Sequence, residues 1–175
     1  SDRGLLISAT GTGKTFLSCF DVKKVKPQRM LFIAHRKTIL QKAKETFESI
    51  IQNKKMSLYN GEDNSADYLF AMIQTLNKKE HLEKFPKDYF DYIVIDEVHH
   101  SGAKTYQNLI NYFQPKFLLG MTATPERTDD FDIYELFNHN IAYEIRLYDA
   151  LRENLLCPFH YFGVSDILIE GKEID

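Results

Sequence analysis

A glycine-containing loop between an apolar strand and a helix start constrains this chain more than any other feature. The apolar residues 5–7 are followed by Ser-Ala-Thr-Gly-Thr-Gly-Lys-Thr at positions 8–15, and then by residues 16–20, which can begin a helix. Glycines in such a loop let successive backbone N–H groups point at phosphate oxygens, and the helix start adds the positive end of its dipole. The pattern predicts a phosphate-binding loop within a strand–loop–helix unit.

The residue types in this loop predict individual roles. Lys14 is expected to reach the β- and γ-phosphates of a nucleotide, and Thr15 to hold Mg²⁺ through its hydroxyl. The general pattern has glycine where Ser8 stands, which is the one departure. A glycine-rich turn with an exposed lysine is the alternative, and the strand-to-helix context disfavours it. The predicted nucleotide contacts are Thr10, Gly11, Thr12, Gly13, Lys14 and Thr15.

A second candidate site lies where Asp96 and Glu97 follow the apolar run 92–95. A carboxylate at the carboxyl end of a buried strand points into the crevice where open α/β sheets bind ligands. Asp96 is therefore predicted to hold Mg²⁺, and Glu97 to orient the attacking water or accept its proton. The alternative is an acidic turn that closes the strand, but a phosphate loop upstream favours the catalytic interpretation.

The remaining pattern alternates between strands and helices. Apolar runs at 30–34, 68–73 and 117–119 are typical of strands in a parallel sheet that is covered on both faces. Helical spacing at 39–51 and 106–113 predicts amphipathic crossover helices. The sequence thus predicts an α/β domain with a mostly parallel sheet sandwiched by helices. The aromatic residues assigned to its core include Phe113, Phe117 and Tyr143.

Composition excludes several classes of protein. A chain of 175 residues, 43% of them apolar, fits about one domain with a buried core. The net charge of −3 means that any binding to nucleic acid depends on a local surface. Two cysteines, Cys19 and Cys157, cannot form the framework of a disulfide-rich secreted domain. No apolar run reaches the ~18 residues of a membrane span, so we expect a cytoplasmic protein without a membrane segment.

Three motifs in this order resemble the first RecA-like domain of superfamily 2 helicases and translocases, in the DExH branch. They are Ala-Thr-Gly-Thr-Gly-Lys-Thr at 9–15, Asp-Glu-Val-His at 96–99 and Thr-Ala-Thr-Pro at 122–125. The likeness is greatest to the motor subunits of restriction enzymes and to DEVH-type repair helicases. It covers residues 5 to about 127 and implies a RecA-like P-loop domain that binds and hydrolyses ATP with Mg²⁺.

The resemblance also implies a set of residues that couple ATP hydrolysis to domain movement. These are His99, Thr122 and Thr124. In the family the strand that ends at Thr122 lies between the phosphate-loop strand and the strand that ends at Asp96. Ordinary hydroxyl capping of a strand end is the alternative for the threonines. Arg127 is expected to have a local or domain-closing role, because the family takes its arginine finger from the second domain.

A third set of residues matches segments that contact the sugar-phosphate backbone of DNA in relatives. His35 and Arg36 precede a predicted helix that carries Lys37, Lys42 and Lys44, and Thr75 is a weaker match. A helix start offers N–H donors and an arginine offers a charged fork for phosphate. The alternative is a solvated basic helix face.

We therefore expect residues 1–146 to form a helicase ATP-binding domain, and 147–175 to lead towards a second RecA-like domain. In the family, ATP and nucleic acid bind across the cleft between the two domains, so this chain is expected to have little ATPase activity alone. The predicted function is the first domain of an ATP-dependent DNA helicase or translocase. One alternative is a P-loop kinase or switch, which needs neither Glu97 beside Asp96 nor the threonine motif. A non-catalytic scaffold is another, and the intact Lys14 argues against it.

Overall fold

One parallel sheet of seven strands forms the centre of the protein. The computed structural model describes residues 2–62, 65–98, 103–124, 133–146 and 152–153. The sheet order is β3-β4-β2-β5-β6-β1-β7, and every neighbouring pair is parallel. The strands are β1 (Asp2–Ser8), β2 (Met30–Ala34), β3 (Met56–Leu58), β4 (Tyr68–Met72), β5 (Tyr92–Asp96), β6 (Phe117–Thr122) and β7 (Ile141–Ile145). The predicted α/β class is confirmed.

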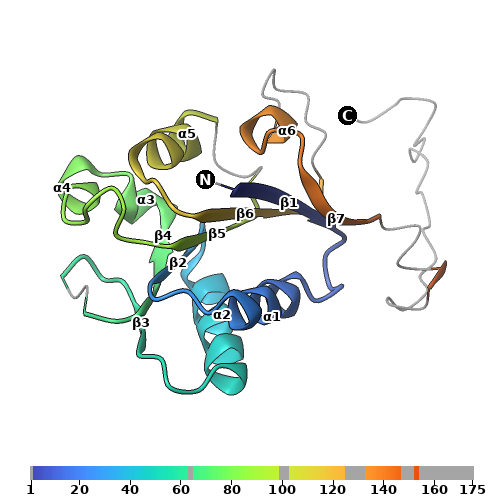
Figure 1. Cartoon of the computed structure of the whole chain (residues 1–175), viewed down its shortest axis with the longest axis horizontal. Coiled ribbons are helices and arrows are strands. Elements are labelled where there is room, and N and C mark those ends of the chain that lie inside the picture. The colour runs from blue at the N-terminus through green and yellow to red at the C-terminus, as the bar shows by residue number, and fades with distance from the viewer. Residues whose placement is uncertain (1, 63–64, 99–102, 125–132, 147–151, 154–175) are drawn as a thin grey trace, which may run out of the picture.

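Helices cover both faces of the sheet (Figure 1). They are α1 (Lys14–Val25), α2 (Lys37–Ile50), α3 (Ile73–Leu76), α4 (Lys79–Leu82), α5 (Ala103–Tyr112) and α6 (Ile133–Leu136). Figure 1 shows α1 and α2 below the sheet and α5 and α6 above it. Because all strands run in one direction, their carboxyl ends meet at the same edge, and the loops that carry the motifs start there.

The strands carry continuous apolar runs because alternate residues fill two separate cores. On the side of α1 and α2, Phe32, Phe47 and Phe70 form an aromatic cluster with ring centroids 5.5–5.8 Å apart. All three rings are fully buried, and burial of each contributes about 2–3 kcal/mol. The spacing of Leu40, Ala43 and Phe47 places all three on the buried side of α2.

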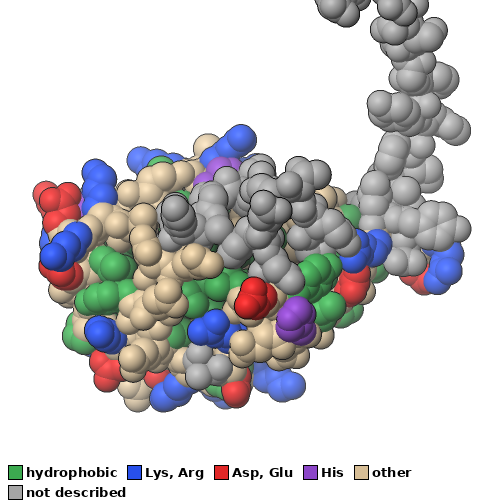
Figure 2. Space-filling view, turned by 90° about the horizontal axis from the view of Figure 1, so that it is seen from above, with side chains coloured by type: hydrophobic (Ala, Val, Ile, Leu, Met, Phe, Trp, Pro, Cys, Tyr) green, Lys and Arg blue, Asp and Glu red, His purple; other side chains and the backbone are tan. Residues whose placement is uncertain are grey.

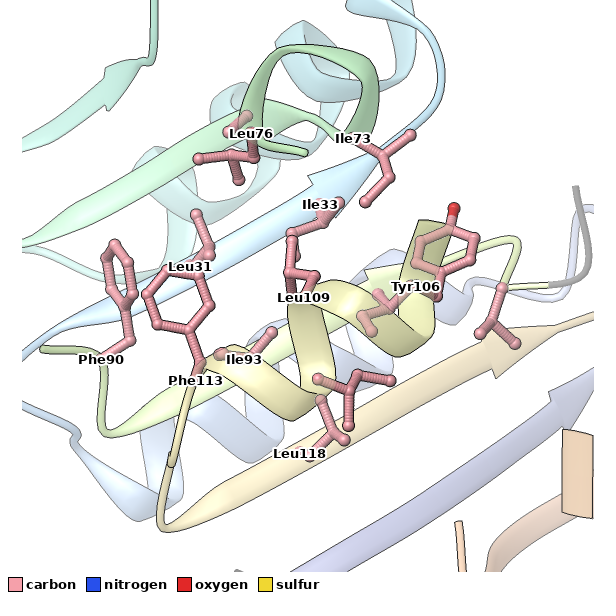
Figure 3. Packing of buried hydrophobic residues seen from close by; sticks show 14 of the residues in the cluster. Leu31, Ile33, Ile73, Leu76, Phe90, Ile93, Tyr106, Leu109, Phe113 and Leu118 are labelled. Carbon is pink, nitrogen blue, oxygen red and sulfur yellow. The ribbon is translucent and has the colours of Figure 1, made fainter. Parts of the chain in front are cut away.

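The opposite core lies between the sheet and helix α5 (Figure 3). Tyr106, Leu109 and Phe113 come from α5 or directly follow it, and they belong to the same buried cluster as Leu31 and Ile93 from the strands. Neighbouring Phe32 on β2 belongs to the other cluster. This alternation explains why β2 and β5 are buried along their whole length, as the sequence predicts.

Two of the three aromatic residues assigned to the core lie at the surface instead. Phe113 is buried, but Phe117 is 38% exposed and Tyr143 is 46% exposed. Phe117 begins β6 at the amino-terminal edge of the sheet, where its ring stacks on Tyr92 with centroids 5.9 Å apart. Tyr143 lies on β7, an edge strand whose residues are exposed. The assignment failed because aromatic character reveals neither the place of a strand in the sheet, as for Tyr143, nor the place of a residue along its strand, as for Phe117.

Helix α6 is positioned by a close contact between Phe137 and the backbone of β6. A Cβ atom at Gly120 would lie 2.2 Å from Cζ of Phe137, whose ring is fully buried. We therefore expect Gly120→Ala to lower the free energy of unfolding by about 1–3 kcal/mol. Chemical denaturation measures this loss. Combined with Phe137→Leu, the substitution should cost less than the sum of the two single changes.

Gly4→Ala is the matched control for this prediction. Its Cβ would lie 3.3 Å from Cβ of Ala142, a contact that a small shift can relieve. Equal stability losses for Gly4→Ala and Gly120→Ala would contradict the role assigned to Phe137.

Candidate nucleotide-binding site

The loop between β1 and α1 has the conformation that a phosphate loop requires. Gly11 and Gly13 have φ angles of 88° and 87°, in the left-handed region that favours glycine. Gly13 is the N-cap of α1 and makes no side-chain cap, so the first N–H groups of the helix are available to a ligand. A Cβ atom at Gly13 would have no neighbour within 4 Å, so glycine is favoured here by the positive φ angle and not by a lack of room for a side chain.

Ser8, the departure from the general loop pattern, is part of the internal hydrogen bonding of the loop. Its hydroxyl forms a short hydrogen bond with Oγ1 of Thr12, and Thr12 Oγ1 donates to the carbonyl of Ala9 at 2.6 Å. Because the Thr12 proton is engaged by Ala9, Ser8 acts as the donor to Thr12. Ser8 is therefore compatible with the loop, because its side chain forms a hydrogen bond within it.

Lys14 lies between the phosphate loop and the acidic strand end. Its ammonium donates to the carbonyl of Ser8 at 3.0 Å and lies 3.4 Å from Oε1 of Glu97. The Lys14 side chain is only 9% exposed. The two motifs are thus joined by a largely buried ion pair, although β6 separates their strands in the sheet.

Asp96 ends β5 in a position that disfavours its charge. The residue is 6% exposed. Burial, and then the neighbouring charge of Glu97, raise the pKa of Asp96 to about 6, against the opposing effects of Lys14 and the Glu97 backbone N–H. Glu97 has a φ of 50°, which is uncommon for a residue other than glycine. A cation near these two neighbouring carboxylates would stabilise the charge of Asp96.

One pocket of about 330 Å³ brings the two motifs together. Its lining residues are Thr10, Gly11, Gly13, Lys14, Thr15, Phe16, Lys42, Thr46, Asp96 and Glu97. Of the predicted nucleotide contacts, Thr12 alone does not line it. Sequence reasoning missed Phe16, Lys42 and Thr46 as pocket residues. The last two are four residues apart on α2, but only the packing of α2 beside α1 turns that face towards the loop.

The donor atoms in this pocket suit Mg²⁺. Thr15 supplies a hydroxyl and Asp96 a carboxylate, which are the oxygen ligands that this ion prefers. Among the described residues, no cluster of three or more His, Cys, Asp or Glu side chains could hold a metal by itself.

The predicted coupling residue Thr122 lies between the two motifs. It ends β6, is fully buried, and is in register with Ile7 of β1. The backbone N–H of Thr124 donates to its hydroxyl at 3.2 Å. The predicted position of this strand between β1 and β5 is confirmed. His99 and Arg127 lie outside the described residues.

The predicted DNA-contacting residues follow neighbouring strands, at a different part of the same sheet edge. His35 and Arg36 follow β2, and Thr75 follows the neighbouring strand β4. The Gln74 side chain donates to the carbonyl of His35 at 3.3 Å, and Lys37 and Thr75 line one cavity of about 300 Å³. Arg36 is exposed and begins α2 without a side-chain cap. These residues therefore form a second candidate site, separate from the nucleotide pocket.

The basic residues of α2 do not form one face for DNA. Lys44 forms an ion pair with Glu48 at 2.6 Å, and Lys42 lines the nucleotide pocket. Only Lys37 lines the cavity that Thr75 also lines. Figure 2 shows the other side of the sheet, seen from above, where acidic and basic side chains both occur; α2 lies on the far side of this view (Figure 1).

The fold and this pocket define a RecA-like P-loop domain of the helicase type. The chain belongs to the family described as "Type III restriction enzyme, res subunit", whose model matches residues 1–127. It is 28% identical over 186 residues to the Type I restriction enzyme EcoAI endonuclease subunit of Escherichia coli, covering 97% of this chain and 22% of that protein. It is also 28% identical over 149 residues to the DNA 3′–5′ translocase XPB2 of Sulfurisphaera tokodaii, covering 81% of this chain and 31% of that protein.

A solved structure shares the fold. The Hef helicase domain of Pyrococcus furiosus superposes with a TM-score of 0.69 at 20% identity, over 82% of this chain and 35% of that one. The chain spans less than a third of the length of the two relatives named above. None of the helices in the described part of the chain has the length and apolar character needed to cross a membrane.

The buried charge of Asp96 predicts a pH dependence of stability. Its pKa is raised when the protein folds, so unfolding releases a proton between about pH 4 and 6, and the stability contributed by this group falls as pH rises through that range. Asp96→Asn removes the charge. We expect it to stabilise the protein without nucleotide by about 1–3 kcal/mol at pH 7.5, and by much less at pH 4. Denaturation at the two pH values measures the difference.

Asp91→Asn is a control that should change the free energy of unfolding in the opposite direction. Burial alone would raise the pKa of Asp91, but hydrogen bonds from Lys116 and from the backbone N–H groups of Arg29 and Gln28 lower it overall. Removal of the Asp91 charge should therefore destabilise the protein at pH 7.5, and this destabilisation should disappear in acid, where the carboxyl is protonated. If Asp96→Asn also destabilised the protein at pH 7.5, the assignment of a disfavoured charge would be wrong.

Proposed function

We propose that this chain is the ATP-binding and ATP-hydrolysing first domain of an ATP-dependent DNA helicase or translocase of the restriction type. One observation carries the proposal: Lys14 of the phosphate loop and Glu97 of the acidic strand end contact each other at 3.4 Å, in a pocket that also contains Asp96 and Thr15. A triphosphate-binding group, a magnesium-binding pair and a candidate for water activation thus line one pocket.

The contacts of Lys14 suggest how the pocket responds to a nucleotide. The ammonium of Lys14 is shared between Glu97 and the carbonyl of Ser8. Phosphate oxygens compete with Glu97 for this ammonium, because both are anionic acceptors. As Lys14 turns to phosphate, the carboxylate of Glu97 becomes available to orient a water or accept its proton. Mg²⁺ held by Thr15 and Asp96 would neutralise charge on the β- and γ-phosphates.

The proposed polynucleotide partner is DNA, bound through its backbone at the site formed by His35, Arg36 and Thr75. The uncapped start of α2 and the exposed arginine are suited to phosphate, and they carry no base-reading information. The two relatives named above support DNA, because one is a restriction endonuclease subunit and the other a DNA translocase. We further infer that hydrolysis couples to movement through His99, Thr122 and Thr124.

A second RecA-like domain is proposed to complete both sites. Residues 1–146 would form the ATP-binding domain and 147–175 the connection to its partner. An arginine supplied from another domain is worth roughly 10³–10⁵ in the rate of phosphoryl transfer. The 175-residue chain is therefore expected to bind ATP weakly and to hydrolyse it slowly. A P-loop kinase is the alternative, and transfer of the γ-phosphate to an acceptor other than water would favour it.

Substitutions in the pocket test binding and hydrolysis separately. We expect Lys14→Ala to abolish ATP binding, because it removes the buried cation. Glu97→Gln should retain binding, since the amide competes less for Lys14, and should reduce hydrolysis by about 10²-fold or more. Equilibrium binding of ATP and single-turnover phosphate release measure the two effects. Normal hydrolysis by Glu97→Gln would contradict the role given to this carboxylate.

The DNA site is tested through its dependence on salt. We expect Arg36→Ala to weaken DNA binding for all sequences, and to reduce the slope of log K against log salt by about 1, because one phosphate contact is lost. Arg29→Ala is the matched control: Arg29 precedes β2 at its other end, where its guanidinium lies 3.9 Å from the ring centroid of Tyr89. Equal effects of the two substitutions would argue against a DNA site at Arg36.

A further inference from the structure

Helix α2 contributes a cation to the nucleotide pocket that belongs to neither nucleotide motif. Lys42 and Thr46 form its part of the pocket wall, and residues of the phosphate loop and the acidic strand end form the rest. The linear sequence groups Lys42 with the basic residues expected to contact DNA. Its position in the fold separates it from them, because Lys37 lines a different cavity.

The Lys42 side chain is available to a ligand. It is exposed, and among the described residues none forms an ion pair or hydrogen bond with its ammonium. Lys44, two residues further on, is paired with Glu48 at 2.6 Å and does not line the pocket. The acidic residues of α2 therefore leave Lys42 uncompensated.

Lys42 balances the negative charge of the carboxylates that line the pocket. The charged lining residues are two lysines, Lys14 and Lys42, and two carboxylates, Asp96 and Glu97. Lys14 is already engaged with Glu97. Without Lys42, carboxylates would outnumber cations in a pocket that has to accept an anionic triphosphate.

We propose that Lys42 is a nucleotide-binding residue, and that its ammonium raises the affinity of the pocket for the anionic oxygens of a nucleoside triphosphate. The proposal rests on the proposed function, because it assumes that this pocket holds the triphosphate. Thr46 contributes little beside it, since its hydroxyl donates to the carbonyl of Lys42 at 2.9 Å within the helix.

The test is the affinity of the 175-residue chain for Mg·ATP, measured by competition with a fluorescent ATP analogue at low and high salt. We expect Lys42→Ala to weaken binding roughly five- to tenfold at low salt, as for a charged contact at an exposed position. The difference should shrink at high salt, because the Debye length falls to about 3 Å at 1 M. Lys42→Glu should weaken binding further, and DNA affinity should change less than twofold in Lys42→Ala.

Lys44→Ala is the matched control for the charge of Lys42. It removes the same charge from the same helix outside the pocket, and should bind Mg·ATP within about twofold of the unaltered protein. If Lys42→Ala matched this control, or weakened DNA binding in place of ATP binding, the proposal would be wrong.

Lys14→Ala separates this proposal from the one on which it rests. Loss of ATP binding in Lys14→Ala together with normal binding in Lys42→Ala would overturn the role of Lys42 alone. Normal ATP binding in Lys14→Ala would overturn the nucleotide pocket itself. Thermal unfolding of each variant shows whether lost binding reflects a lost fold.

Discussion

Parallel pairing of β1, β6 and β5 is the constraint on which the rest of the site depends. It brings the carboxyl ends of three strands to one edge, so that the phosphate loop, Thr122 and the acidic pair start from neighbouring positions. The crossovers that parallel strands require are helices, and their apolar faces bury the sheet on both sides. The contact between Lys14 and Glu97 is therefore a consequence of topology.

The pocket is organised at some cost to stability. Asp96 keeps a carboxylate where burial and Glu97 both oppose its charge, and Glu97 itself adopts a left-handed backbone conformation. Such features are tolerated where the surrounding structure holds them in place, here the paired ends of β5 and β6. A cation would relieve the unfavourable charge of the two carboxylates, so the same arrangement that destabilises the unliganded domain favours binding of the magnesium that accompanies a nucleotide.

Helix α2 connects the two candidate sites. Its first residues follow Arg36 at the proposed DNA site, and Lys42 and Thr46 line the nucleotide pocket about one and a half to two and a half turns further on. The buried side of the helix, with Leu40, Ala43 and Phe47, is anchored in the aromatic core. A displacement of α2 against the sheet would therefore change both sites together. The basic residues of this helix also lie in two different environments, although the helix is only fourteen residues long.

Local sequence determined the phosphate loop, the acidic strand end and the buried strands, because each depends on neighbouring residues. These are Gly11 and Gly13 before Lys14, carboxylates after an apolar run, and apolar residues at every position of β2. The strand β3, helix α6 and the edge strand β7 were not recognised, because elements of three to five residues are too short to show a strand or helix period. Tertiary structure alone decided which aromatic residues are exposed and which lysine of α2 faces the nucleotide pocket. The reason is physical: both depend on the position of a strand or helix in the sheet, and strand order is set by contacts between residues far apart in the chain.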